Sequence, residues 1–254
     1  IAGAAWATLI AWFVSILGLI LWSFRTLRAT PWHLDVRALQ EVTRLGLPLA
    51  VQRILGVLGF LLFSIVLGWC GEAHLAAHAL VLRIVSVSFL PGYAIGEAAS
   101  VLVGQSLGAK KPERATEAWW MGTQLAIAVM TGCALLFITA PELWLTPFKP
   151  SPEVRLLGIQ LLLIAGVFQI FDAVAMVGLS CLAGAGDTRF SMFTTITCMW
   201  LFNLPLALLL SWVMGWGAPG AWCAMTAEIF AIAVICWWRI RSGHWMKHYE
   251  GMAF

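Results

Sequence analysis

The sequence predicts an all-α protein that crosses a membrane several times. Of its 254 residues, 61% are hydrophobic and only 11% are charged, whereas soluble globular domains average about 45–50% and about 25%. Apolar stretches of roughly 20 residues, the length that a helix needs to cross a bilayer, recur along the chain. We expect all of them to be helical, because lipid offers no partner for the backbone groups of an open strand. The composition excludes a soluble domain, and nothing in it supports nucleic-acid binding.

Seven apolar segments are predicted to be the spans. If they alternate in direction, one set of connections holds most of the 15 Lys and Arg residues, while the opposite set holds only Lys149 and Arg155. Because Lys and Arg collect in cytoplasmic loops, we expect the C-terminus in the cytoplasm and residue 1 on the outer side. The segments are roughly 2–24, 45–69, 76–103, 118–140, 154–180, 190–212 and 218–238.

The connections give further expectations. The stretch 25–44 is either a plain linker or holds a short interfacial helix. The outer connection 141–153 contains four prolines, which predict a stiff loop without regular helix. The six cysteines form no CxxC pair, so neither a disulfide framework nor a zinc site is indicated. The chain opens without Met and carries no charge before Arg25, which we interpret as a cut inside a longer chain.

Five ionisable side chains fall inside the predicted spans. A charge at the centre of a membrane helix costs about 2.5 to 3.5 kcal/mol on insertion scales, so each is a candidate functional group. The alternative is that some pair with each other or lie close enough to an interface to reach water. The five are Arg53, Arg83, Glu97, Asp172 and Glu228.

Asp172 is the strongest of these candidates. Gln169, Asp172, Met176 and Ser180 are spaced by three and four residues, so they form one polar stripe that should face the interior of the bundle. A carboxylate there can accept a proton or coordinate Na⁺. Structural pairing, above all with Arg53, is the alternative.

The third segment also carries a polar face. Arg83, Ser86, Leu90, Tyr93 and Glu97 follow a three-four spacing, and Pro91-Gly92 interrupts the helix between its two charges. Broken helices free backbone carbonyls near the membrane centre, a geometry that transporters use for ion and substrate sites. Packing is the other interpretation, since Pro and Gly are common in membrane helices.

The last two spans carry one polar candidate each. Glu228 lies midway along the final segment, and Asn203 precedes Pro205, which should kink the sixth. Asn203 either lines the same cavity or makes a hydrogen bond between helices.

Three blocks of sequence carry a family resemblance. They are Leu45-Gly46-Leu47-Pro48, the block Val103-Gly104-Gln105-Ser106-Leu107-Gly108-Ala109, and the block Cys181-Leu182-Ala183-Gly184-Ala185-Gly186-Asp187-Thr188-Arg189. Together they resemble the multidrug and toxic compound extrusion (MATE) family of the MOP superfamily. The glycines of these blocks suit close packing and left-handed turns, and Asp187 can cap the next helix.

The resemblance implies a six-helix transporter lobe plus one preceding transmembrane helix. In these terms 1–24 is a transmembrane helix of the preceding lobe, 25–44 a cytoplasmic linker between lobes, 45–238 the C-terminal lobe, and 239–254 a cytoplasmic tail. The implied protein is a multi-pass antiporter of the inner cell membrane that exports amphiphilic, cationic drugs or toxic compounds in exchange for H⁺ or Na⁺. It implies no enzyme and no cofactor, and its partners are the small-molecule substrate, the lipid bilayer and the missing N-terminal lobe.

One branch of the family binds the coupling cation with an acid in its tenth helix, and Asp172 matches that position. The same branch has a Glu in its seventh helix, where this chain has Gly56. Asp172 therefore acts alone, acts with Glu97 or Glu228, or leaves the main coupling role to the missing lobe.

Other functions compete with export. A flippase for lipid-linked precursors, from the same superfamily, would use Arg53 and Arg83 to hold phosphates. A membrane-embedded enzyme is disfavoured, because the spans contain no HExxH and no GxSxG. A scaffold that transports nothing is the third alternative.

Overall fold

The computed structural model describes residues 2–29 and 36–246, and every regular element in these ranges is helical. The all-α prediction is confirmed. The chain forms two units, residues 1–43 and 44–254, each described by itself. The first contains α1 (Ala2–Ala29) and the start of α2 (Val36–Trp69). The predicted linker residues 30–35 and tail residues 247–254 lie outside the described ranges.

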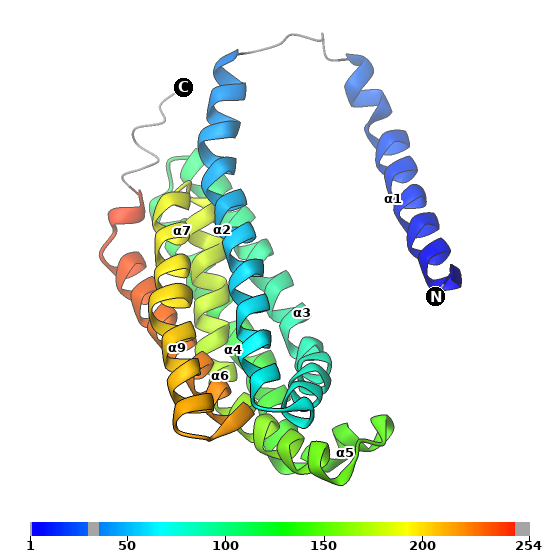
Figure 1. Ribbon diagram of the computed structural model, residues 1–254. Helices are drawn as coiled ribbons and strands as arrows, with labels where there is room; N and C mark the ends of the chain where they lie inside the picture. Colours follow the sequence, from blue (N-terminus) through cyan, green and yellow to red (C-terminus); the bar gives the residue numbers. More distant parts are fainter. Residues whose placement is uncertain (1, 30–35, 247–254) are drawn as a thin grey trace. The chain divides into compact units, whose positions relative to one another are not determined.

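The second unit is a bundle of long helices joined by short turns (Figure 1). Two π-helical turns, at Cys198–Asn203 and Leu209–Val213, flank α8, and 3₁₀ turns follow α5 and α9 at Thr146–Phe148 and His244–Met246. After α2, the helices are α3 (Glu72–Gly108), α4 (Pro112–Thr139), α5 (Pro141–Leu145), α6 (Pro152–Gly184), α7 (Thr188–Thr197), α8 (Leu204–Leu208) and α9 (Gly217–Arg241).

Six of the described helical stretches are long and apolar enough to cross a membrane. These are Val42–Trp69, Glu72–Gly108, Pro112–Thr139, Pro152–Gly184, Thr188–Val213 and Gly217–Arg241. They correspond to the six spans predicted for the lobe. Within α1, the described apolar stretch is the shorter Leu9–Leu21, so a seventh span over 2–24 stays a prediction.

Some boundaries differ from the sequence-based expectation. Helix α1 continues to Ala29, and α2 begins at Val36, inside the stretch expected to be linker or a separate interfacial helix. The connection 141–153 is not free of helix either, since α5 covers Pro141–Leu145. Pro141 occupies the first helical position, where its missing N–H breaks no hydrogen bond, so the proline count alone was misleading.

Helix α6 lies at the centre of the second unit and packs against α3, α4 and α9. Its apolar residues enter two buried clusters. One includes Ala173, Val177 and Leu182 with residues of α3, α4 and α9, and the other includes Leu161 and Phe168 with residues of α2, α3 and α9. A helix buried on several sides is apolar all round, and α6 has this composition from Leu161 onward apart from its polar stripe.

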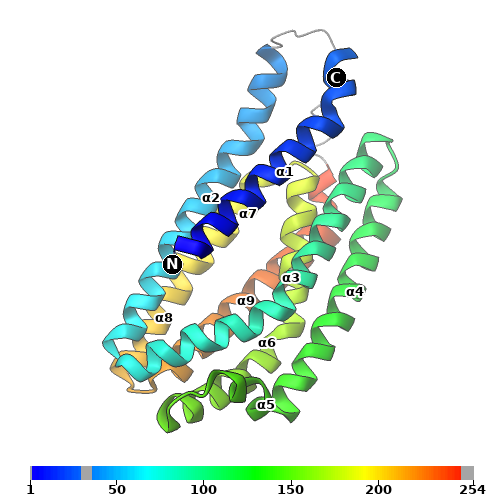
Figure 2. The same ribbon diagram turned by 90° about the vertical axis from the view of Figure 1, so that its right-hand side faces the viewer.

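Helix α3 remains a single helix through Pro91, although it bends along its length (Figure 2). The predicted interruption at Pro91-Gly92 is therefore wrong as a break in the helix. Gly92 is buried, and a methyl group there would lie 2.7 Å from the Met130 sulfur of α4. The packing interpretation of this dipeptide is the one that the structure supports.

Candidate functional site

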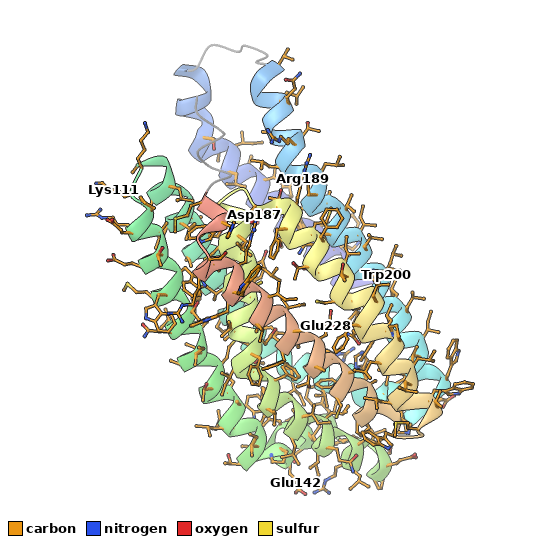
Figure 3. All side chains as sticks on the ribbon, turned by 90° about the vertical axis from the view of Figure 1, so that its left-hand side faces the viewer. Lys111, Glu142, Asp187, Arg189, Trp200 and Glu228 are labelled. Atoms are coloured by element: carbon orange, nitrogen blue, oxygen red, sulfur yellow. The ribbon has the colours of Figure 1, made fainter. Side chains whose placement is uncertain are left out.

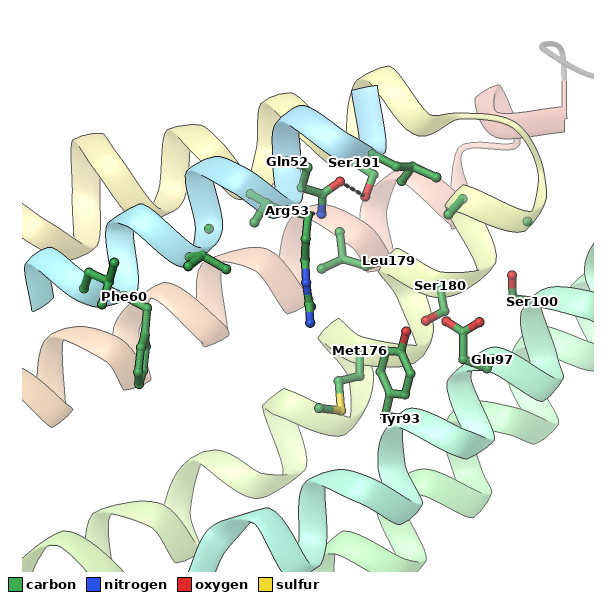
Figure 4. A pocket seen from close by; sticks show the side chains of 17 residues that line it. Gln52, Arg53, Phe60, Tyr93, Glu97, Ser100, Met176, Leu179, Ser180 and Ser191 are labelled. Carbon is green, nitrogen blue, oxygen red and sulfur yellow. Dashed lines mark hydrogen bonds between the residues drawn. The ribbon is translucent and has the colours of Figure 1, made fainter. Parts of the chain in front are cut away.

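The second unit contains a cavity of about 910 Å³ between α2, α3, α6 and α7 (Figure 4). Its wall is mixed, with an apolar part and a polar part. The apolar part includes Leu49, Val57, Phe60, Leu61, Met176 and Leu179, and the polar part consists of Gln52, Arg53, Tyr93, Glu97, Ser100, Ser180, Ser191 and Thr195.

Two charged side chains line this cavity from different helices. Arg53 extends from α2 and Glu97 from α3, and both are exposed. Neither forms an ion pair or hydrogen bond with any residue that the structure describes. The predicted pairing of Arg53 with Asp172 is therefore not present, and both charged groups are available to a ligand.

Hydrogen bonds hold the wall beside Arg53 in place. The Gln52 amide nitrogen donates to the Thr195 hydroxyl at 3.0 Å, and the Ser191 hydroxyl donates to the Gln52 amide oxygen at 3.3 Å. These contacts join α2 to α7 directly next to Arg53. Gln52, Ser191 and Thr195 were not singled out from the sequence, because small polar residues in a span carry no signal until their neighbours are known.

Asp172 is buried in α6, with 9% of its surface exposed, and does not line the cavity. One turn further along the same stripe, Met176 and then Ser180 do line it. At the other end, fully buried Gln169 donates to the Ser88 hydroxyl at 2.6 Å. The predicted stripe thus faces the interior and runs from the core to the cavity. The Asp172 Oδ2 atom is buried without a hydrogen-bond partner in the described part of the chain.

Glu228 is also buried and lies away from the cavity lining. Its carboxylate accepts a hydrogen bond from the side-chain amide of buried Asn203. This is the interhelical hydrogen bond that was one of the two interpretations of Asn203. Figure 3 places Glu228 between α9 and the helix that carries Trp200. Asn203 ends the first π-helical turn, and such turns accommodate local irregularity next to a proline, here Pro205.

Arg83 does not reach the cavity. It is exposed on α3, outside the cavity lining, whereas Tyr93 and Glu97 of the same predicted face line the cavity. The face predicted from helical spacing is therefore only partly a cavity wall. The reason is the bend of α3, which turns its two halves in different directions.

The three candidate coupling acids do not form one site. Among the described residues, no three His, Cys, Asp or Glu side chains come together as a metal-binding group. Any Na⁺ bound at Asp172 would need backbone, hydroxyl, amide or water oxygens for its other ligands. Asp172 and Glu228 are buried acids, and Glu97 is a cavity acid.

Residues 48–209 match the family model MatE. The chain belongs to the MATE family. A probable multidrug resistance protein NorM of Burkholderia pseudomallei is 34% identical over 204 residues, which are 78% of this chain and 44% of the relative. A protein of the same description from Brucella suis is 29% identical over 256 residues, which are 95% and 54% of the two chains.

Solved MATE structures have the same fold. A crystal structure of MATE in the bent conformation gives a TM-score of 0.85 at 19% identity and covers 98% of this chain and 57% of its own. The MATE transporter ClbM in complex with Rb⁺ gives 0.81 at 19% identity and covers 93% and 55%. The chain thus spans about half the length of the relatives that it matches.

The MATE motif glycines have separate structural uses. A Cβ atom on Gly104 would lie 3.1 Å from the carbonyl oxygen of Gly184, so α3 and α6 approach closely at this point. Gly186 has a φ of 82°, in the left-handed region that glycine favours. Gly108 ends α3 without a positive φ, and the left-handed residue there is Lys110.

The other motif residues are also structural. Pro48 is buried inside α2, and Gln105 supplies a backbone carbonyl to the amide of Ala109 at the end of α3. Asp187 occupies the N-cap position of α7, as predicted, but its side chain makes no capping hydrogen bond there. Its carboxylate instead forms an ion pair at 2.9 Å with Arg239.

Gly56, the residue that the resemblance matches to a Glu of one MATE branch, lies in the cavity wall. A Cβ atom built there meets no other atom within 4 Å. The position therefore faces open space, and in this chain the wall of α2 offers the charge of Arg53 one turn away instead of an acid.

Proposed function

We propose that this chain forms one lobe of a secondary active antiporter that exports amphiphilic, cationic compounds in exchange for H⁺ or Na⁺. Membership of the MATE family supports transport, and the related NorM proteins are described as multidrug resistance proteins. The cavity has the size and the mixture of apolar and polar walls that bind drug-sized molecules, for which pockets of about 300 to 1,000 Å³ are usual.

The observation that carries the proposal is the position of Asp172. Its carboxylate is buried with one oxygen unpartnered, while its own helical stripe reaches the cavity one turn away. An ionised carboxylate without a partner is unfavourable in such surroundings, so taking up H⁺ or Na⁺ removes that cost.

Coupling then follows from linkage. If the cation and the substrate favour different arrangements of the transporter, each changes the affinity of the protein for the other by the same factor. The residues that contact substrate lie in the cavity, and Met176 connects them to Asp172 along α6. A small movement of α6 at one end of the stripe can therefore displace the side chains at the other end.

Efflux from cells tests this proposal. The chain is expressed in bacteria that lack their own pumps, alone and together with the first half of the Burkholderia relative, and loss of a fluorescent lipophilic cation from preloaded cells is measured. We expect Asp172→Asn to abolish efflux, and Glu117→Gln, an exposed acid on α4, to leave it unchanged. A fluorescent tag checks that both variants reach the membrane in equal amounts.

The result decides between transport and a scaffold role. Full efflux by Asp172→Asn would overturn the coupling role of this carboxylate, and no efflux from any combination would favour a scaffold. Purified protein in liposomes then identifies the ion, since an imposed pH gradient drives uptake in a proton antiporter and an imposed Na⁺ gradient drives it in a sodium antiporter.

One observation favours the lipid-precursor flippase as a second candidate. Arg53 lines the cavity without an acidic partner among the described residues, as a phosphate-binding residue would. Arg83, the second basic residue expected for that function, lies outside the cavity lining. A flippase would move a fluorescent diphosphate lipid across liposome membranes and leave the lipophilic cation in place.

A further inference from the structure

Three tryptophans and an arginine form a cluster on the surface of the second unit, where side chains of α4 and α9 meet. We propose that this tryptophan cluster, made of Trp119, Trp120, Trp237 and Arg241, binds the phosphate group of an anionic membrane lipid. The first two residues belong to α4, and the other two lie in the last two turns of α9. Among the described residues, none of α4 or α9 lines the cavity, so this site is separate from the one proposed for transport.

The three rings pack edge to face across the two helices. The ring centre of Trp237 lies 5.2 Å from that of Trp119 and 5.6 Å from that of Trp120, at interplanar angles of 63° and 68°. Trp119 is 5% exposed, whereas Trp120 is 42% exposed. Because one side of the cluster is packed and the other is open, it suits the level of the lipid headgroups, where tryptophans collect.

Arg241 supplies the positive charge of the tryptophan cluster. Its guanidinium carbon lies over the Trp237 ring, 5.7 Å from the ring centre. The side chain is exposed and forms no ion pair or hydrogen bond with any residue that the structure describes. A guanidinium stacked on an aromatic ring keeps its N–H edge free, and this edge matches two oxygens of a phosphate group.

Neighbouring arginines do not offer the same combination. Arg239, two residues earlier on α9, is already paired with Asp187 and contacts the Phe190 ring. Arg155 is paired with Glu142, which lies at the other end of the bundle from Asp187 in Figure 3. Arg241 thus has a ring beneath it and a charge that no described acid neutralises.

The surrounding charge also favours an anion. The turn between α3 and α4 and the first turn of α4 carry three exposed basic residues, Lys110, Lys111 and Arg114, against one exposed acid, Glu113. Figure 3 shows Lys111 at the same end of the bundle as Asp187, the partner of Arg239. Basic residues close to a membrane surface attract anionic lipids.

The exposed face of α9 suits an acyl chain of the same lipid. Phe230, Val234, Trp237 and Arg241 follow spacings of four, three and four residues, so they form one stripe on the helix. Phe230 and Val234 are exposed apolar side chains. At 1.5 Å per residue the stripe is roughly 16 Å long, about half the thickness of a bilayer core. A phosphate at Arg241 therefore places a lipid chain along Val234 and Phe230.

A purely structural role for these residues makes a different prediction. Arg241 in the last turn of α9 also complements the helix dipole, and tryptophans anchor helices at any membrane surface. Neither effect distinguishes one lipid class from another. A preference for an anionic lipid that depends on Arg241 is therefore the property to measure.

Native mass spectrometry of the purified chain in detergent measures this preference. The chain is mixed with dioleoyl phosphatidylglycerol, phosphatidylethanolamine or phosphatidylcholine at equal concentrations. We expect one phosphatidylglycerol to bind about fivefold or more tightly than phosphatidylcholine, which is the effect of one basic residue near an anionic membrane surface. Arg241→Gln should remove this preference and Arg241→Lys should keep part of it. The control Arg155→Gln, an exposed arginine on α6, should keep all of it.

Thermal unfolding separates lipid binding from a change in the fold. Phosphatidylglycerol should raise the melting temperature of the wild type and of Arg155→Gln, and should raise that of Arg241→Gln no more than phosphatidylcholine does. Trp237→Leu, which removes the ring beneath the guanidinium, should also reduce the lipid-dependent increase. If Arg241→Gln lowers the melting temperature equally with and without lipid, the role of Arg241 is structural and the proposal fails.

Four other results would overturn the assignment. The first two are equal binding of the three lipids and an equal loss of preference in Arg155→Gln and Arg241→Gln. Tightest binding of phosphatidylethanolamine would indicate that exposed Glu117 of α4 binds its ammonium group instead. Displacement of the lipid by inorganic phosphate would show a general anion site. The efflux assay does not depend on any of these outcomes, so the failure of either proposal leaves the other intact.

Discussion

Gly122→Ala tests how closely α4 packs against α3 and α6. A Cβ atom at Gly122 would lie 2.7 Å from the Cβ of Ala99 on α3 and 3.5 Å from the Val177 Cγ1 atom on α6. Ala99 is 3% exposed, and its methyl group is fixed by the backbone, so it cannot rotate away. One of the helices must therefore move to admit the new methyl group.

The expected cost can be isolated with a control on the same helix. Overpacking a well-packed interior typically costs about 1 to 3 kcal/mol. Replacing Gly by Ala inside a helix otherwise stabilises it by roughly 0.5 to 1 kcal/mol. Gly132 is also on α4, and a Cβ atom there meets nothing within 4 Å. Gly132→Ala should therefore show the stabilisation from replacing Gly by Ala without the overpacking cost. The free energies of unfolding of the two variants should then differ by about 1 to 3 kcal/mol.

Thermal unfolding of the purified chain in detergent measures this difference. For domains of about 150 to 250 residues, 1 kcal/mol shifts the melting temperature by about 2 to 4 °C, so Gly122→Ala should melt roughly 2 to 12 °C below Gly132→Ala. Equal melting temperatures, or a higher one for Gly122→Ala, would show that α4 does not approach α3 as closely as described.

Two further predictions concern one buried and one partly buried polar pair, and the same unfolding assay measures both. Asn203→Leu should destabilise the chain by about 1 to 3 kcal/mol, because the buried Glu228 carboxylate loses its hydrogen-bond donor. Adding Glu228→Leu should recover part of that loss. A double variant less stable than Asn203→Leu alone would contradict this pairing. Arg239→Leu should cost about 1.5 to 3 kcal/mol because it removes the ion pair with Asp187 and the cation–π contact with Phe190, and an unchanged melting temperature would contradict the pairing.

The spans were predictable from the sequence because membrane insertion depends on length and apolar content, which are properties of each segment alone. The ends of the helices were harder to place. Residues 36–44 are polar enough to be interpreted as linker, yet α2 includes them, because a helix can continue beyond the apolar region once its first turn has formed. The prolines of 141–153 predicted a loop without helix, yet α5 begins at Pro141, because a proline can occupy the first position of a helix.

The interior orientation of Asp172 was also predictable, since helical spacing places it on one face with Gln169 and Ser180. Helical spacing failed to separate Arg83 from Tyr93 and Glu97, because it assumes a straight helix and α3 bends along its length. The partner of Asp187 could not be predicted from the sequence either. A capping role follows from neighbours in sequence, whereas Arg239 is separated from it by 52 residues and meets it only after α9 has packed.

The same packing explains why the acids inside the spans divide into two kinds. A residue at a span centre is costly if charged, and the sequence alone assigns that cost equally to Glu97, Asp172 and Glu228. The packed structure gives them different surroundings. Asp172 on α6 and Glu228 on α9 are buried, whereas Glu97 on α3 lines the cavity. A buried acid responds to the small ions that can reach it, and a cavity acid responds to whatever molecule fills the cavity. The different surroundings of the three acids are thus a consequence of how α3, α6 and α9 pack.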